Sequence, residues 1–375
     1  MPLQLLAIPA WARMTGASCN ACHMTPTLQL TFQGREFLRN GHRLEPTGFD
    51  KADAKWDNYL SMEWDLGATK APGSAVSVSQ PAAELFVGGP VSEHLSFKGE
   101  VDVTFSGNGQ SSDLAVDNAY LQYNEAIPGG FVAVRAGQIY PEVLQIWGVV
   151  QPGSDQFFGD TLGGAGLKGN ATTAFSANQG FDVKVDLNSW IFAGGLLNGA
   201  ASNLPADKGY HNDSYLSAMY QFKKWLAVGA YHFDGTYNVY QTDGDTTTPF
   251  LFLDKYDTNA LFATVTGKRW RVTAVGYGGR DQVDAAGAKI KNGGTYLIGT
   301  YNLTDTFGAY GRVDTYKPDR SVGGNLIRQQ LVGVNGFLHL SDHSGSRWAL
   351  EYSRVEVEGT PGPANQVAAS LFWIF

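Results

Sequence analysis

Hydrophobic and polar residues alternate along most of the chain. In residues 97–105, 216–222 and 347–353, apolar side chains recur at about every second position, with mostly polar ones between them. This period of two is typical of half-buried antiparallel β-strands. It predicts strands near residues 57–68, 79–88, 94–106, 115–125, 130–139, 165–175, 180–187, 189–198, 213–223, 225–236, 256–267, 270–280, 293–303, 306–316, 326–340, 346–357 and 365–375.

Three features favour a membrane-spanning barrel over a soluble β-sandwich, which would show the same alternation. The predicted strands, at about 9–13 residues, are long enough to cross a bilayer at a tilt. The last strand alternates up to Phe375, a pattern that resembles the recognition signal of bacterial outer-membrane proteins. Aromatic residues that suit interfacial girdles lie at predicted strand ends: Trp225, Trp270, Tyr310, Tyr316 and Trp348.

The expected fold is therefore all-β, a transmembrane antiparallel β-barrel over residues 55–375 in the outer membrane of a bacterial cell. Single-chain bacterial barrels use even strand numbers, so we expect about 16 strands. The surplus prediction is expected in the short region 165–187. Turns are predicted at 88–90, 127–130 and 303–306. Segments rich in Gly, Asp and Thr predict extracellular loops at 140–164, 199–212, 237–254 and 281–292.

Composition excludes several other classes of protein. Only 17% of the 375 residues are charged, Gly contributes 46, and the aromatic residues are 9 Trp, 17 Tyr and 21 Phe. The aromatic content excludes a disordered chain. The lack of apolar runs of about 18 residues excludes a bundle of membrane helices. A net charge of −8 argues against nucleic acid as a partner, whereas outer-membrane lipid is the expected surroundings.

The two cysteines carry the clearest chemical signal. Cys19 and Cys22 are followed directly by His23, which gives the CxxCH sequence of c-type haem attachment. Each thiol can add to one vinyl group of the porphyrin, and the adjacent histidine then lies under the iron as its proximal ligand. The alternatives are a thioredoxin-like redox pair, half of a zinc site and a structural disulfide. The first lacks a visible βαβ unit and the second lacks another ligand pair, so we expect one covalent haem c.

The segment around this motif is short. Residues 1–12 look like the remnant of a secretory signal that ends in a small-x-small cleavage sequence. Residues 13–45 hold the motif and one predicted helix, 34–40, which Gly41 would end. A cytochrome c-like segment of about thirty residues cannot build a core of its own. We therefore expect it to fold as a haem-binding helical plug in the barrel lumen, where the wall completes the haem pocket.

The haem iron needs a sixth ligand, which a second His or a Met can supply. His42 is the nearest candidate for the distal ligand, and a solvated loop histidine is the alternative interpretation. Met24 adjoins His23 and cannot easily reach the opposite face of the haem. Met14 and Met62 are further possibilities.

No other motif in the sequence indicates chemistry. Electron transfer needs no acid–base pair, so the lack of a catalytic triad or carboxylate dyad is consistent with it, and no catalytic residue is expected. Four acids in predicted loops are expected to be solvated: Asp155, Asp160, Asp243 and Asp245. The scattered histidines are expected to be structural or on the surface: His94, His211, His232, His339 and His343.

The N-terminal residues resemble a known family. Residues 9–13 (Pro-Ala-Trp-Ala-Arg), the CxxCH, residues 34–37 and Asn40-Gly41 are similar to the fused monohaem cytochrome–porins of the bacterial outer membrane, which include outer-membrane ferrous-iron oxidases. The resemblance implies that Fe(II) outside the cell is oxidised and that its electron passes through one haem to a periplasmic c-type cytochrome. His42 stands where the family pattern has an aromatic residue, which can change the ligand set and the haem potential.

Several functions stay open on the sequence alone. The first is an inward electron conduit, which would make the protein a ferrous-iron oxidase. The second is outward electron export to an extracellular acceptor or a docked cytochrome. The third is a diffusion porin whose haem segment is a structural plug. A soluble periplasmic β-protein with one haem is a further alternative.

Overall fold

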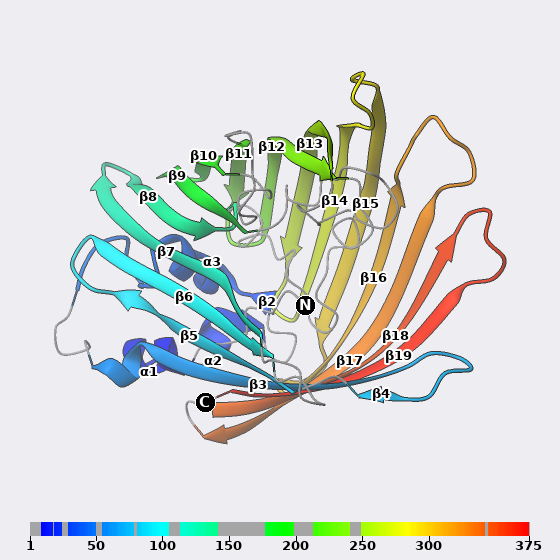
Figure 1. Cartoon of the computed structure of the whole chain (residues 1–375). Coiled ribbons are helices and arrows are strands. Elements are labelled where there is room, and N and C mark those ends of the chain that lie inside the picture. Colours follow the sequence, from blue (N-terminus) through cyan, green and yellow to red (C-terminus); the bar gives the residue numbers. More distant parts are fainter. Residues whose placement is uncertain are drawn as a thin grey trace.

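The computed structural model describes residues 9–17, 19–24, 29–49, 55–78, 81–104, 113–141, 177–198, 213–240, 249–341 and 344–374. Their strands form a closed antiparallel barrel in which β19 pairs back to β3, as the sequence predicts (Figure 1). The wall consists of β3 (Leu60–Lys70), β4 (Ser77–Val78), β5 (Ala82–Pro90), β6 (Leu95–Thr104), β7 (Asp113–Ile127), β8 (Gly130–Ile139), β9 (Asn178–Leu187), β10 (Trp190–Leu197), β11 (Asp213–Phe222), β12 (Leu226–Tyr240), β13 (Phe250–Thr266), β14 (Trp270–Gln282), β15 (Lys289–Asn302), β16 (Phe307–Lys317), β17 (Ile327–Ser341), β18 (Ser344–Val357) and β19 (Ala364–Ile374).

The described part of the chain gives the expected even number of strands. β4 has two residues and pairs with β3 beyond the end of β5, so it prolongs β5 instead of adding a strand. The strands β3 to β19 without β4 therefore make a 16-strand wall. Each falls on a predicted strand, and the surplus prediction at 165–175 lies outside the described residues.

Two predicted loops are corrected because they are shorter than the sequence suggests. β12 continues to Tyr240 and β13 begins at Phe250, within the predicted loop 237–254. β14 and β15 likewise leave only residues 283–288 between them. In β13 the added residues Phe250 to Leu253 are all apolar, so no alternation marks them as a strand. The predicted loops 140–164, beyond residue 141, and 199–212 lie outside the described residues.

The two faces of the wall differ in polarity. Outward-facing aliphatic side chains are widely exposed, among them Leu216 at 67% and Leu261 at 69%. Inward-facing residues include Arg271 and Arg347, which are at most 1% exposed. An apolar outer face around a polar interior is the arrangement of a barrel that stands in lipid. The protein is thus built for the outer membrane of a bacterium, as expected.

Two of the predicted girdle residues face the lumen instead of the membrane interface. Tyr310 and Tyr316 occupy inward positions of β16 and are buried, whereas Trp225 and Trp270 are exposed at strand ends. A sequence with aromatics on both faces does not reveal which face each one shares. The ring of Tyr310 lies over Gly333 of the neighbouring strand, where a Cβ would approach its Cζ to 2.4 Å. Part of the high glycine content therefore makes room for inward rings.

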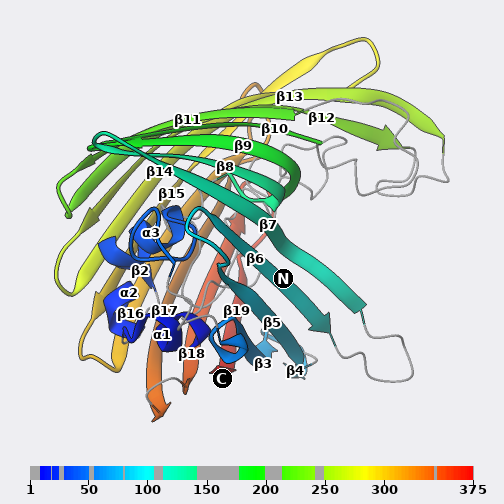
Figure 2. The ribbon, with the colours of Figure 1, turned by 90° about the vertical axis from the view of Figure 1, so that its left-hand side faces the viewer.

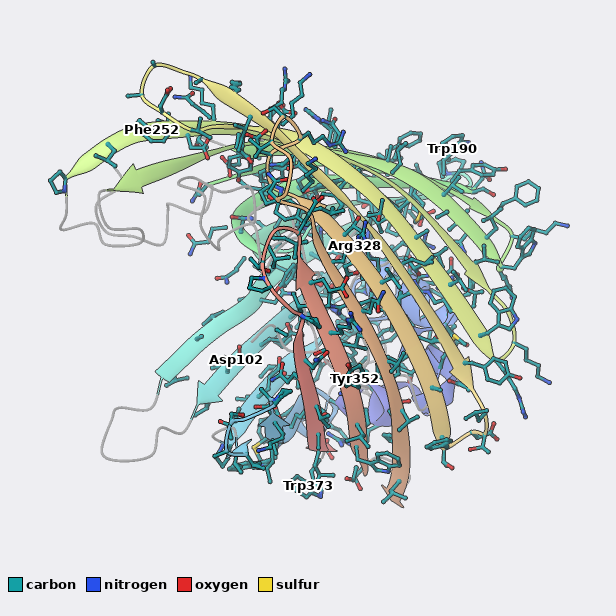
Figure 3. The ribbon with its side chains drawn as sticks, turned by 90° about the vertical axis from the view of Figure 1, so that its right-hand side faces the viewer. Asp102, Trp190, Phe252, Arg328, Tyr352 and Trp373 are labelled. Carbon is teal, nitrogen blue, oxygen red and sulfur yellow. The ribbon has the colours of Figure 1, made fainter. Side chains whose placement is uncertain are left out.

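The two ends of the barrel can be told apart by their connections. Short turns join strands at residues 91–94, 128–129, 188–189, 223–225, 267–269 and 303–306. The predicted turns at 127–130 and 303–306 are confirmed, while residues 88–90 are the end of β5 and the turn follows at 91–94. Short turns face the periplasm in bacterial barrels. Figure 3 shows Trp190 and Trp373 towards this end and Phe252 at the opposite, extracellular one.

The described residues between 9 and 49 form a small plug inside the ring of strands (Figure 2). Its described elements are α1 (Pro9–Thr15), α2 (Cys19–Cys22), β1 (His23–Met24), β2 (Gln29–Leu30) and α3 (Phe32–Arg39), and a 3-10 helix η2 (Trp56–Asn58) leads into β3. β1 and β2 pair antiparallel, with His23 opposite Leu30. Among the described residues, no helix is long and apolar enough to cross a membrane.

Candidate functional site

Helix α3 begins next to the CxxCH motif. Thr31 caps it, because its hydroxyl oxygen accepts from the Gly34 amide at 3.1 Å. The same residue ties α3 to α2: its amide donates to the Cys22 carbonyl at 2.8 Å, and its hydroxyl donates to the Ala21 carbonyl at 2.6 Å. A Cβ on Gly34 would lie 2.1 Å from the Cys22 carbonyl oxygen. Only glycine therefore permits this approach.

The end of α3 fixes the position of His42. The Gly41 amide donates to Leu38 at 3.1 Å and the His42 amide donates to Phe37 at 2.9 Å, which is the Schellman pattern. Gly41 has φ +76, so the prediction that it ends the helix is confirmed. His42 also has a positive φ, of 61. A non-glycine residue in this region is uncommon and strained, which marks His42 as a residue that its surroundings hold in place.

His42 is fully buried in an aromatic box. The ring of Trp11 stacks on it with centroids 4.3 Å apart, and Phe37 meets it edge-on at 6.2 Å. Its Nε2 lies 3.4 Å from the hydroxyl of Tyr120 on β7, and its Nδ1 has no hydrogen-bond partner among the described residues. Burial, and then the charge of Lys98, hold the pKa of His42 well below its usual value. The imidazole is therefore neutral and has a nitrogen lone pair available.

The attachment motif itself lies in the plug. Cys19 begins the single turn α2 and Cys22 ends it, partly buried. His23 and Met24 follow in β1 and are 7% and 6% exposed. Helix α3, which is about 12 Å long at eight residues, separates this end of the plug from His42.

Two other candidate ligands occupy different positions. Met62 is an outward-facing residue of β3 and is 37% exposed, so the suggestion that it binds the iron is wrong. Because successive side chains of a strand point to opposite faces, its neighbours Ser61 and Glu63 face the lumen instead. Met14 belongs to α1 and packs against Gly89 of β5. Its Sδ lies 3.5 Å from the place that a Cβ on Gly89 would occupy.

The wall satisfies the carbonyl groups at the end of α3. Gln122 Nε2 and Lys184 Nζ donate to the Arg39 carbonyl at 2.9 and 2.6 Å. Asn124 Nδ2 donates to the Asn40 carbonyl at 2.7 Å. The last carbonyls of a helix have no partner within it, and a cation at this end also suits the helix dipole. The barrel thus completes a helix that the short plug could not finish by itself.

Helix α1 crosses the boundary predicted between residues 12 and 13. The Ala10 amide donates to Ser61 Oγ at 2.7 Å, and Trp11 Nε1 donates to the Gly88 carbonyl at 2.9 Å. Arg13 Nη2 donates to the Leu60 carbonyl at 2.7 Å. Residues on both sides of the predicted cleavage point therefore contact the wall, and the signal remnant 1–12 stays a prediction.

The remaining predicted residues do not gather at the plug. His94 lies in the 91–94 turn, and its Nδ1 lies 2.8 Å from the Asn124 carbonyl. His232 faces outward beside Asp234 and Asn259. The structure does not describe the side chain of His339 in β17. The other predicted acids and histidines lie outside the described residues: Asp155, Asp160, Asp243, Asp245, His211 and His343. The described residues contain no group of three or more His, Cys, Asp and Glu that could hold a metal ion.

The donor set of the plug fits a c-type haem. The two cysteines lie on one helical turn, and His23 follows them directly. His42 offers a buried, neutral imidazole with an unpartnered Nδ1. Cations also surround this end of the lumen, among them Arg39, Arg43 and Lys184.

Comparison with solved structures identifies the fold. The anion-selective porin of Comamonas acidovorans is similar with a TM-score of 0.62 and 11% identity, over 84% of this chain and 98% of that one. OmpF of Salmonella typhi, solved with daunomycin, gives 0.59 and 12% over 84% and 97%. A loop-deletion mutant of OmpT from Vibrio cholerae gives 0.56 and 14% over 84% and 98%. The chain has a porin fold.

The similarity covers only part of the chain. The matched share, 84% of 375 residues, is about 315 residues, the size of the barrel from β3 to β19. No model of a protein family and no curated protein matches the chain. The comparisons therefore describe the barrel of this outer-membrane porin fold, and the function of the plug rests on its own residues.

Sequence reasoning missed the wall residues that hold the plug. Gln122, Asn124, Lys184 and Arg271 contact plug carbonyls, yet each is one polar residue among many on an alternating strand. The one available signal was the pair of polar residues Gln122 and Asn124 two positions apart. That spacing indicates a shared face but not what the face contacts.

Proposed function

We propose that this protein is an outer-membrane electron conduit that carries single electrons from extracellular Fe(II) to a periplasmic c-type cytochrome. One haem c would be attached to Cys19 and Cys22, with His23 as proximal and His42 as distal ligand. The observation that carries the proposal is that the plug that contains the CxxCH packs against the inner wall of the barrel, where Gln122 and Lys184 hold the end of α3. When bound there, haem c supplies a one-electron carrier within reach of a periplasmic partner.

The residues of the chain would hold this carrier rigidly and keep water away from it. The Schellman cap and the rings of Trp11, Phe37 and Tyr120 fix the orientation of His42. The neutral state of His42 is the state that binds a metal. Firmly held ligands and a buried site would lower the reorganisation energy of each electron transfer. They would also set the reduction potential of the haem.

The donor would have to enter the lumen, because the haem segment lies near the periplasmic end. Three inward-facing carboxylates lie in the extracellular halves of β11, β13 and β14: Asp213, Asp254 and Asp281. Clustered acidic groups attract a divalent cation such as Fe²⁺. Fe(II) would become Fe(III) by loss of one electron, and the periplasmic cytochrome would gain that electron.

Proteoliposomes with cytochrome c trapped inside and Fe(II) added outside would test the proposal. Reduction of the trapped cytochrome without leakage of a small anion is expected for the wild type, and no reduction for the haem-free control variant Cys19→Ser/Cys22→Ser. Purified wild-type protein without covalent haem would refute the proposal.

A diffusion porin with a structural haem plug is the second candidate, favoured by the porin fold of the barrel. Anion leakage from the same vesicles without reduction of the trapped cytochrome would support it. Outward electron export uses the same path in reverse. A haem midpoint potential well below that of the Fe(III)/Fe(II) donor couple would favour that direction.

A further inference from the structure

Three cationic residues gather on the outward face at the extracellular ends of β14 and β15. Arg280 and Lys291 are directly opposite each other in the register of these two strands, which lie side by side in Figure 1. Arg320 follows β16, and its guanidinium lies over the glycine pair Gly278 and Gly293. A Cβ on Gly293 would approach Arg320 Nη2 to 2.6 Å, so glycine at this position makes room for the arginine. The three cations therefore share one patch of the outer surface.

Acidic residues balance only part of the positive charge in this region. Asp257 of β13 accepts from Arg280 Nε at 2.7 Å. Lys317, at the end of β16, attracts the carboxylate of Asp319. These two pairs leave two cations of the region unmatched.

Lys291 and Arg320 are the unmatched cations. Both are exposed, and neither belongs to an ion pair among the residues that the structure describes. Lys291 also stands opposite Arg280, and like charges directly opposite each other destabilise a pair of strands. An anion between them would relieve the repulsion. Arginine binds phosphate with paired hydrogen bonds and lysine binds it as a point charge, so the patch suits a phosphate group.

The patch lies at the height of the outer lipid headgroups. Trp270 is exposed at the periplasmic end of β14, and Arg280 comes ten residues later in the same strand. Ten residues span about 34 Å, which is about 26 Å across the membrane at a tilt of about 40°. The apolar band of such barrels is about 25 Å tall. The outward residues between them carry no charge: Val272, Ala274, Gly276 and Gly278.

A groove on the outer face continues from the patch into the apolar band. Its upper part is lined by the three cations, and its lower part by Leu216, Ala230, Leu261 and Gly276. A Cβ on Gly276 would meet no atom within 4 Å, so the floor of the groove is open at this position. Small residues between larger aliphatic ones thus leave space for a hydrocarbon chain directly below the phosphate-binding cations.

We propose that the patch and the groove together bind a phosphorylated lipid of the outer leaflet. Lys291 and Arg320 hold its phosphate, and one acyl chain lies in the groove over Gly276. The cations favour a lipid over a second copy of this chain, because they stand at the level where lipid phosphates are concentrated. The site needs no haem and goes beyond the electron transfer proposed above. The bound lipid fixes the extracellular ends of β14 and β15 in the membrane.

Removal of the two unmatched charges tests the headgroup site. Lys291→Gln/Arg320→Gln changes exposed positions only. Lys268→Gln/Arg269→Gln is the matched control, because it removes one exposed lysine and one exposed arginine from the periplasmic turn 267–269. Heat-modifiable gel mobility of the full chain reports whether each variant has folded. Native mass spectrometry of the folded proteins in detergent then measures binding of the probe, diphosphorylated lipid A.

The double variant Lys291→Gln/Arg320→Gln is expected to bind lipid A about 30-fold more weakly than wild type, because each cation near a membrane surface contributes roughly a factor of five. The control should bind lipid A as wild type does, and wild type should bind dephosphorylated lipid A as weakly as the double variant binds the phosphorylated probe. Gly276→Phe keeps the charges and fills the groove, so it should also weaken binding. Leu261→Trp fills the same groove if Gly276→Phe fails to fold.

Unchanged binding in the double variant, or an equal loss in the control, would overturn the site. Unchanged binding in the groove variants would show that the cations hold a phosphate without the acyl chain, and would overturn the lipid proposal as well. Sedimentation in detergent tests a second copy as the occupant: self-association that the double variant abolishes, with no binding of lipid A to wild type, would count against the lipid. None of these results depends on whether the protein carries haem.

Discussion

Substitution of Gly34 by alanine sets two physical effects against each other. Alanine favours a helix interior over glycine by about 1 kcal/mol, which alone would stabilise α3. The new Cβ, however, would lie 2.1 Å from the Cys22 carbonyl oxygen and 2.9 Å from its carbon. These are backbone atoms that cannot rotate away, so α3 has to retreat from α2.

Retreat of α3 has a cost that can be worked out from the contacts. It breaks the two hydrogen bonds from Thr31, to Cys22 at 2.8 Å and to Ala21 at 2.6 Å, at about 1 kcal/mol each. Residual overpacking adds about 1–3 kcal/mol. After the gain in helix propensity is subtracted, about 2–4 kcal/mol of destabilisation remains, which is roughly 30-fold to 700-fold in an equilibrium constant.

Hydrogen exchange of the peptide that contains α3 measures this effect directly. The amides of residues 31–40 in Gly34→Ala are expected to exchange faster than in wild type by the factor given above. Gln33→Ala is the matched control, because Gln33 is the exposed neighbour in the same helix and gains propensity without a collision. Slower exchange in Gly34→Ala, like that expected for the control, would refute the packing of α3 on the CxxCH motif.

Three further predictions follow from the arrangement of plug and wall. Deletion of residues 13–45 should raise the conductance of the barrel in planar bilayers, and an unchanged conductance would contradict a luminal plug. His42→Ala should convert a six-coordinate, low-spin haem spectrum to a high-spin one, whereas a wild-type spectrum would assign the sixth ligand elsewhere. Leu216→Arg should lower the free energy of unfolding in lipid vesicles by about 2–4 kcal/mol, and a loss equal to that of Leu216→Ala would contradict lipid contact.

The strands could be predicted because period two is a local property of the sequence. The strand positions follow from residues two places apart in the sequence, whereas the even strand number came from the general rule for bacterial barrels. The sequence near a residue does not show which face of the strand meets lipid. Tyr310 and Tyr316 point inward, and Met62 points outward. Aromatic and sulfur side chains are acceptable on either face, so only the closed barrel decides their direction.

The plug was predictable in its parts and not in its contacts. Gly41 as the end of α3 follows from local backbone geometry, and the CxxCH follows from chemistry. Gln122, Asn124 and Lys184 donate hydrogen bonds to the carbonyls at the end of α3. The partners of these bonds are 83 to 145 positions apart in the sequence. Such pairs depend on the closure of the barrel around the plug, for which one sequence carries no signal.

The same contacts constrain the order of assembly. The plug touches β3 through Ser61, β7 through Gln122, β9 through Lys184 and β14 through Arg271, so strands far apart around the ring enclose it. His42 and His23 are buried in that enclosure. A segment of this length cannot build a core of its own, so it acquires its packed structure only when the wall forms around it.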